Sequence, residues 1–264
     1  MPASSVTVCV LTYGDHYELA HRCLQSILQA CPELGAGGLR VGLNDVGDRT
    51  AEYIDGLVQH KLLSPANVYR SAVNIHKYPM MRRMFYDEHN PITTPYVMWF
   101  DDDSFIVSDM IGKQPSFLER AVTALEQAGS AVVMAGSAYV IPWAKGQQEW
   151  VQDQPWYRGR ELPQKPAFCT GGWWVARLDA LRALNYPWPE LDHRGGDVML
   201  GQALYQREWR FLSYRLGVAI NADAEGRESK AQRRGFDQQP IGTGYVRGKP
   251  LPPRRQSLVD KLDL

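Results

Sequence analysis

Three consecutive carboxylates, Asp101, Asp102 and Asp103, are the clearest sign of chemistry in this sequence. They follow directly on the apolar and aromatic run 96–100, which has the pattern of a buried strand. Adjacent carboxylates repel one another, so a fold that holds them together usually supplies a cation. Hard oxygen ligands on a short loop suit Mg²⁺ or Mn²⁺ carrying a substrate phosphate. The alternative is an acidic turn that caps a helix beginning near Phe117.

The elements that must position this loop alternate between strand and helix. A β-branched run at 6–12 predicts a strand covered on both faces, and apolar spacing of three and four residues at 17–30 predicts a helix. The same reasoning predicts the following strands and helices: strands at 39–43, 67–71 and 96–100, helices at 50–58 and 80–88. Together they predict a three-layer α/β/α sandwich with a mostly parallel central sheet and a Rossmann-like, nucleotide-binding first half.

Parallel sheets bind ligands beyond the carboxyl ends of their strands. In this sequence those ends carry polar residues at 13–15, 44–45, 70–74 and 101–103. No GxxxxGK[ST] segment is present and no GxGxxG follows the first strand, so a P-loop enzyme and a dinucleotide dehydrogenase are both disfavoured. Asp15 also stands where it could cap the helix at 17–30.

The overall composition limits the partners and the compartment. The 264 residues carry 29 Lys and Arg against 29 Asp and Glu, so no global field draws the molecule to nucleic acid or membrane. The four cysteines show no CxxC spacing and lie mostly in apolar patterns, which predicts small buried side chains rather than disulfides or zinc ligands. No apolar leader and no run of about 20 apolar residues occurs, which predicts a cytoplasmic protein without a membrane span, in a bacterial or virus-infected cell.

The second half is rich in tryptophan. Six of the eight Trp fall between Trp143 and Trp188, among Pro, Gly and polar residues. Flat indole faces can stack on sugar rings or bases, and the candidate acceptor contacts are Trp143, Trp173 and Trp174. Several of these Trp could instead close the core.

The same half predicts a helix at 117–128, a strand at 131–141 and a last strand at 209–220. Between 227 and 255, eight Lys or Arg stand against two acids. This basic segment is expected to be either a solvated, flexible tail or a mobile lid over a diphosphate.

Several segments resemble a known enzyme family. VTVCVLTYGDHYELAHRCLQSIL at 6–28 resembles the opening strand and helix of family 2 glycosyltransferases, and LNDVGDRT at 43–50 resembles their acidic turn after the second strand. FDDDSFI at 100–106 resembles the DxD loop of the GT-A fold. TGGWWVAR at 170–177 and GGDVMLG at 195–201 bring it closer to Fringe-like glycosyltransferases. The combined resemblance covers roughly residues 5–220.

The resemblance implies a nucleotide-diphosphate sugar, expected to be a UDP-sugar, held through Mn²⁺ or Mg²⁺. It assigns the metal to Asp103 together with Asp101, and the donor sugar or ribose to Asp101, with Asp102 sharing one of these tasks. The complete donor-binding set is Thr12, Tyr13, Asp15, Asn44, Asp45, Lys77, Arg82, Asp101, Asp102, Gly171 and Gly172. For Lys77 and Arg82 the alternative is a solvated charge on a helix face.

The resemblance also implies a catalytic base, Asp197, at a turn that opens a helix. A carboxylate there can take the proton from an acceptor hydroxyl as its oxygen attacks the sugar. The alternative for Asp197 is a helix cap, and the reserve bases are Asp192 and His193. The family often places a His ligand near the last strand, but no His follows His193, so Asn221 or Asp223 is expected to complete the metal site.

These observations predict one GT-A domain over 1–264, with a donor half at 5–110, an acceptor half at 111–225 and a basic segment at 226–264. The predicted function is metal-dependent, inverting sugar transfer to a glycan or to a hydroxymethylated base in DNA. A nucleotidyltransferase and a non-catalytic sugar-binding module are the alternatives. The sequence leaves the oligomeric state open.

Overall fold

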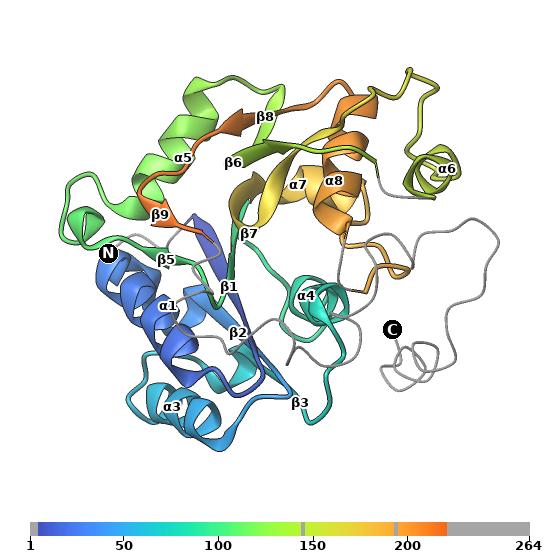
Figure 1. Ribbon diagram of the computed structural model, residues 1–264. Coiled ribbons are helices and arrows are strands. Elements are labelled where there is room, and N and C mark those ends of the chain that lie inside the picture. Colours follow the sequence, from blue (N-terminus) through green and yellow to red (C-terminus); the bar gives the residue numbers. More distant parts are fainter. Residues whose placement is uncertain (1–4, 144–145, 193–194, 221–264) are drawn as a thin grey trace.

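The computed structural model describes residues 5–143, 146–192 and 195–220, which are built around one seven-stranded sheet (Figure 1). The strands lie in the order β3-β2-β1-β4-β7-β6-β8. Their bounds are β1 Val6–Tyr13, β2 Leu39–Asn44, β3 Val68–Ser71, β4 Tyr96–Asp101, β6 Val132–Val140, β7 Ala167–Arg177 and β8 Arg210–Ser213. The main helices are α1 Tyr17–Ala30, α3 Asp48–Gln59, α4 Lys77–Phe85, α5 Phe117–Gln127, α6 Gln147–Gln152, α7 Leu178–Ala183 and α8 Gly196–Gln206.

Strands β1 to β4 form a parallel half, and β7 reverses the direction. β1 pairs parallel with β2 and β4, and β2 pairs parallel with β3. β7 runs antiparallel to both of its neighbours, β4 and β6, while β8 is parallel to β6. Strands β5 (Phe105–Ile106) and β9 (Val218–Ala219) form a separate antiparallel pair. The expected three-layer α/β architecture with a mostly parallel sheet is therefore confirmed.

Two hydrophobic cores cover the two faces of the sheet. Side chains alternate along each strand, so Phe100 and Trp173 join one core while their neighbours Trp99 and Trp174 join the other. Helices α1, α3 and α5 pack on the first face, and α4, α6, α7 and α8 pack on the second (Figure 1). The strands shared by both cores are buried on both faces, which is why they read as continuous apolar runs.

The predicted element boundaries differ from the structure in the second half of the chain. The single strand expected at 209–220 is two strands, β8 and β9, which belong to different sheets. Leu216 and Gly217 between them have φ of 50° and 71°, a left-handed turn that an extended strand cannot contain. The segment around TGGWWVAR is strand β7, which lies between β4 and β6 in the sheet, and α4 begins at Lys77, earlier than the predicted 80.

The helix α5 has its own cap and does not use the acidic triplet. Ser116 accepts a hydrogen bond from the Glu119 N–H, and the Glu119 side chain accepts one from the Ser116 N–H. This capping box satisfies the first turn of the helix. The alternative in which Asp101–Asp103 serve as a helix cap is therefore wrong.

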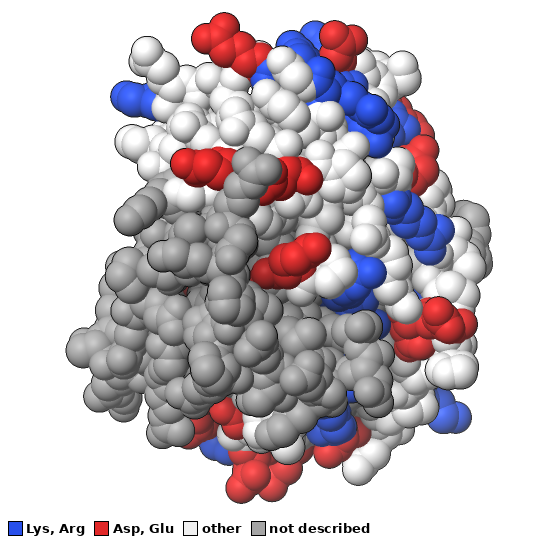
Figure 2. Space-filling model, turned by 90° about the vertical axis from the view of Figure 1, so that its right-hand side faces the viewer, with Lys and Arg blue, Asp and Glu red and all other residues white. Residues whose placement is uncertain are grey.

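The cysteines are buried, as the sequence predicts, and charges of both signs are found on the surface. Cys9, Cys23, Cys31 and Cys169 are all free and buried. Among the described helices, none is both long enough and apolar enough to cross a membrane. On the face shown in Figure 2, Lys and Arg side chains are mixed with Asp and Glu side chains over the described residues.

Candidate functional site

The loops that follow β1, β2 and β4 meet at the carboxyl edge of the parallel strands. The N–H of Tyr13, the last residue of β1, donates to Asp102 Oδ2 at 3.0 Å. Two backbone hydrogen bonds join the first two loops, from the Gly14 N–H to the Asn44 carbonyl at 3.5 Å and from the Gly47 N–H to the Gly14 carbonyl at 3.3 Å. The acidic triplet thus lies beside the loops predicted to bind the nucleotide.

Asp101, the last residue of β4, is held from two sides. Its Oδ1 accepts a hydrogen bond from the Trp99 indole N–H at 2.9 Å, and its Oδ2 lies 2.6 Å from the Lys77 ammonium. Asp102 and Asp103 occupy the turn that follows and are only 3% and 6% exposed. Carboxylates buried to this degree need a cation or hydrogen bonds to offset the loss of water.

Cys23 on α1 lies next to this turn, and the charge of the turn affects the pKa of its thiol. Its thiol lies 3.8 Å from the Asp101 carbonyl oxygen. Burial raises the pKa of Cys23 well above its usual value, and the nearby negative charges of Asp102, Asp103 and Asp101 raise it further. The negative charges of the three carboxylates therefore extend to the buried end of the Cys23 side chain.

Lys77 connects the triplet to β7 and to the predicted base. Its ammonium donates to the Gly171 carbonyl at 2.7 Å as well as to Asp101. The Gly171 N–H in turn donates to Asp197 Oδ2 at 3.2 Å. Four predicted site residues (Lys77, Asp101, Gly171 and Asp197) are thus brought into one continuous network, although they come from four different elements.

Asp197 lies in the first turn of α8 but does not cap it. The cap position belongs to Gly195, in a left-handed conformation with φ of 84°, and no side chain completes the cap. Burial raises the pKa of the Asp197 carboxyl above its usual value, and Lys77 and hydrogen bonds from the backbone partly oppose that shift. A carboxylate with a raised pKa and a fixed direction has the properties of a general base.

The reserve base Asp192 lies in the segment before α8. Its side chain is buried at 5% exposure, and its backbone carbonyl accepts the Tyr78 N–H at 2.8 Å. This contact attaches the segment before α8 to the first turn of α4. The other reserve, His193, lies outside the described residues, as do Asn221, Asp223 and the basic segment 227–255.

Thr12 and Asn44 are buried at the carboxyl ends of β1 and β2 and stabilise this edge of the sheet through hydrogen bonds. They are 0% and 2% exposed. The Thr12 hydroxyl donates to the Gly42 carbonyl at 2.9 Å, while the Asn44 side chain donates to Asn74 Oδ1 at 2.9 Å and accepts from the Ile75 N–H at 2.8 Å. Their contact with a donor stays a prediction, and the bonds seen support the surrounding loops.

Asp15 and Asp45 are exposed on the loops after β1 and β2. The cap position of α1 is His16, and it has no side-chain hydrogen bond, so the expectation that Asp15 caps this helix is wrong. Asp15 instead lies against Gly47, with its Oδ1 2.3 Å from the place that a Cβ would occupy there. Only glycine at that position permits the close approach.

Arg82 is hydrogen-bonded to the turn after α7. Its guanidinium donates to the Pro187 carbonyl at 2.7 Å and to Asn185 Oδ1 at 3.1 Å, and it lies 4.5 Å from the centre of the Tyr86 ring. These contacts tie α4 to the opposite turn. A further contact to a diphosphate stays a prediction.

The tryptophans predicted to bind an acceptor are largely core residues. Trp173 and Trp174 are 0% and 1% exposed, which does not agree with stacking on a ligand. Trp174 instead stacks on Trp99, with ring centres 6.3 Å apart and planes at 17°. Trp143 is partly exposed, and its indole N–H donates to the Pro163 carbonyl at 2.7 Å. The alternative, that several Trp close the core, is correct for Trp173 and Trp174.

We therefore expect Trp174→Ala to destabilise the fold by about 3–5 kcal/mol, because the lost indole leaves a cavity in a close-packed core. Urea unfolding followed by circular dichroism measures this value. Trp143→Ala, at a partly exposed position, is the matched control and should have a smaller effect. A Trp174→Ala protein with wild-type stability and weakened acceptor binding would restore the ligand role.

Sequence reasoning missed the contribution of Trp99. Its indole N–H holds Asp101, and the Lys77 ammonium lies 5.7 Å from the centre of its ring. The sequence does contain a signal for this contact, because residues two apart on a strand point to the same face. Trp99 and Asp101 have that spacing at the end of β4.

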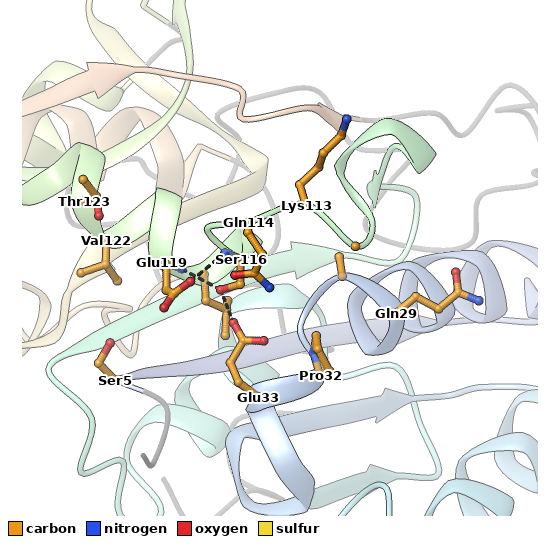
Figure 3. Close-up of a pocket in the computed structure, with 13 residues that line it drawn as sticks. Ser5, Gln29, Pro32, Glu33, Lys113, Gln114, Ser116, Glu119, Val122 and Thr123 are labelled. Carbon is orange, nitrogen blue, oxygen red and sulfur yellow. Dashed lines mark hydrogen bonds between the residues drawn. The ribbon is translucent and has the colours of Figure 1, made fainter. Parts of the chain in front are cut away.

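A separate pocket, of about 490 Å³, lies at the other edge of the sheet (Figure 3). It is bounded by Ser5, which precedes β1, by the end of α1 and by the start of α5. Glu33 and Ser116 are hydrogen-bonded to each other on its wall. None of the predicted site residues lines it, and the carboxyl edge of the strands remains the candidate site.

Comparisons with known proteins identify the fold. No protein-family model and no curated protein matches the sequence. Among solved structures, the chain is similar to the mannosyltransferase PcManGT from Pyrobaculum calidifontis in complex with GDP-Man and Mn²⁺, with a TM-score of 0.53 and 14% identity. It is also similar to GalNAc-T7 with UDP, GalNAc and Mn²⁺, with a TM-score of 0.52 and 10% identity.

The matched regions cover 80% and 84% of this chain but only 55% and 43% of those two chains. With the sheet order and the layers described above, they define the fold: the chain has the GT-A fold. The similarity concerns the fold. The narrower likeness to Fringe-like and family 2 enzymes stays an expectation from the sequence motifs.

Proposed function

We propose that the chain is a metal-dependent, inverting glycosyltransferase that moves a sugar from a nucleotide-diphosphate sugar to an acceptor hydroxyl. The observation that carries this proposal is the network at the carboxyl edge of the sheet. It brings a buried acidic turn and a carboxylate of raised pKa to the two sides of Gly171. A metal-bound leaving group and a general base are the two parts that such a transfer requires.

The residues fit a divalent cation. Asp102 and Asp103 supply adjacent hard oxygen ligands on a buried turn, while Lys77 and Trp99 hold Asp101. No group of three or more His, Cys, Asp or Glu suited to a metal occurs in the part of the chain that the structure describes. An open site of this kind suits Mg²⁺ or Mn²⁺, which keep waters and substrate phosphates as ligands. We propose Asp103 as the main ligand with Asp102 beside it, in place of the Asp101 that the resemblance suggested, because Lys77 and Trp99 hold the Asp101 carboxylate.

A cation held by Asp103 and Asp102 would supply charge stabilisation to the diphosphate leaving group. Asp197 accepts the proton of the acceptor hydroxyl, the hydroxyl oxygen bonds to the anomeric carbon, and the bond from that carbon to the diphosphate oxygen breaks. One displacement with one base inverts the anomeric configuration. Asp101 is held by Lys77 and Trp99, which disfavours it as a covalent nucleophile.

The donor is proposed to be a UDP-sugar, and the screen must include GDP-sugars because one of the matched structures holds GDP-Man and the other UDP. The acceptor is proposed to be a hydroxyl of a glycan. A hydroxymethylated base in DNA remains the second acceptor class. On the described part of the face shown in Figure 2, Lys and Arg side chains lie among Asp and Glu side chains.

We expect release of nucleotide diphosphate from one sugar nucleotide when Mn²⁺ or Mg²⁺ is present, and release at the background level when EDTA removes the metal. A coupled assay of released UDP or GDP measures it. A nucleotidyltransferase would release pyrophosphate from a nucleoside triphosphate instead, and a sugar-binding module would bind without turnover. If no sugar nucleotide binds with metal supplied, the proposal is wrong.

A further inference from the structure

Gly171 lies in a part of β7 that the neighbouring strands do not pair. The register between β4 and β7 ends with Phe100 opposite Trp173. The register between β6 and β7 shifts between Gly136 and Ala138, so that Gly136 faces Trp174 and Ala138 faces Cys169. Residues 170–172 therefore lie outside both described ladders. At this irregularity within β7, Gly171 is hydrogen-bonded to Lys77 through its carbonyl and to Asp197 through its N–H.

The backbone that presents Lys77 is held in an unusual conformation. His76, directly before it, has φ of 71° and ψ of 178°, a region that residues other than glycine rarely adopt. The His76 N–H donates to Asn74 Oδ1 at 2.8 Å, and Asn74 is in turn bonded to Asn44 at the end of β2. Such strain persists where the surroundings fix it, and here it directs the first residue of α4 into the site.

Lys77 itself is buried, and its charge is directed inward. Its side chain is 9% exposed, against 23% for that of Asp101. Two of its three N–H donors bind Asp101 and Gly171, at 2.6 and 2.7 Å. The donor contact suggested for Lys77 by the sequence stays a prediction, and the two bonds seen are made within the protein.

We propose that Lys77 is a positioning residue that fixes the metal turn and the base Asp197 relative to each other, through Asp101 on one side and Gly171 on the other. This inference rests on the proposed function. The ammonium turns the carboxylate of Asp101 inward, which leaves the metal to Asp103 and Asp102. By holding the Gly171 carbonyl, it also sets the direction of the Gly171 N–H that orients Asp197.

The test compares Lys77→Met with the wild-type enzyme in steady-state kinetics. Met keeps most of the length of the side chain and removes its charge and its N–H donors. We expect kcat to fall by about 10²-fold, because a small misplacement of a catalytic group has effects of that size. The donor KM should stay close to the wild-type value. A raised donor KM with an unchanged kcat would show a donor contact instead, and unchanged values of both would exclude any role. Lys61→Met, at an exposed position, is the matched control.

A second variant distinguishes the effect of the Lys77–Asp101 bond from that of the Lys77–Gly171 bond. It also controls for loss of folding. Lys77→Met leaves the Asp101 carboxylate without its ion pair, whereas Lys77→Met combined with Asp101→Asn removes both charges. We expect the double variant to regain thermal stability but to keep a kcat well below that of Asp101→Asn alone. Equal kcat values for these two proteins would show that Lys77 acts through Asp101 only, and would overturn the link to Asp197.

Crystal structures of the wild-type and Lys77→Met proteins give a readout that does not depend on turnover. The bond between the Gly171 N–H and Asp197 Oδ2 should be present in the first and lost in the second. An unchanged bond would overturn the inference even in an active enzyme. If instead the wild-type protein binds no sugar nucleotide but the bond is lost as expected, the proposed function fails while the positioning by Lys77 stands.

Discussion

Asp197→Asn will lower the rate of sugar transfer by about 10²–10⁴-fold, the usual contribution of a general base, while sugar nucleotide and metal still bind. The amide oxygen of Asn can still accept the Gly171 N–H, so the geometry at the start of α8 should persist. What is lost is the capacity to take a proton. Transfer kinetics give the rate, and isothermal titration calorimetry with the donor and Mn²⁺ gives the binding.

The pH dependence of the wild-type enzyme provides an independent check on this assignment. Because burial raises the pKa of Asp197, the base becomes protonated, and transfer declines, at a higher pH than an ordinary Asp would require. The rate should rise with pH through that pKa. Asp179→Asn, which changes an exposed carboxylate in the first turn of α7, is the matched control. Full activity in Asp197→Asn would remove Asp197 from the mechanism.

Asp103→Asn is expected to have the second large effect, a fall in transfer of roughly 10³-fold, because metal ions contribute several kcal/mol of charge stabilisation. A neutral amide is a weaker ligand for a hard cation than a carboxylate, so the affinity for Mn²⁺ in the presence of donor should fall as well. Titration of Mn²⁺ followed by electron paramagnetic resonance measures that affinity.

The control for this prediction is Asp109→Asn, which removes an exposed carboxylate from the short helical turn at Ser108–Met110. It should leave both transfer and metal affinity unchanged. Wild-type Mn²⁺ affinity in Asp103→Asn would contradict the assignment and would move the metal to Asp102 or to residues outside the described part of the chain.

The first half of the fold could be predicted from local pattern. Strands β1 and β4 are apolar runs that end on polar residues, and α1 carries a clear helical spacing, so their bounds follow from the sequence almost residue by residue. Burial on both faces of a parallel strand makes this pattern strong. The acidic triplet after β4 could be placed at the edge of the sheet for the same reason.

The second half could not be predicted in the same way. Which of its side chains are buried, and which contact each other, depends on contacts between distant segments. Trp173 and Trp174 look like candidate ligand contacts in a Trp-rich region, but as neighbours on β7 they point into opposite cores. The bond between Lys77 and Gly171 joins residues 94 positions apart. No periodic pattern in the sequence predicts a contact between residues so far apart.

The reversal of direction at β7 has a consequence for how the enzyme is divided. Since β7 runs against β4, the start of β7 lies at the same edge as the end of β4. The residues assigned to the donor come mainly from the chain before Asp103, and the proposed base comes from α8, much later in the chain. If the proposed roles hold, residues near the base in the later segment can change without altering the residues proposed for the donor. The sheet thus places residues from distant parts of the chain, Lys77 and Asp197, in hydrogen bonds to one glycine, Gly171.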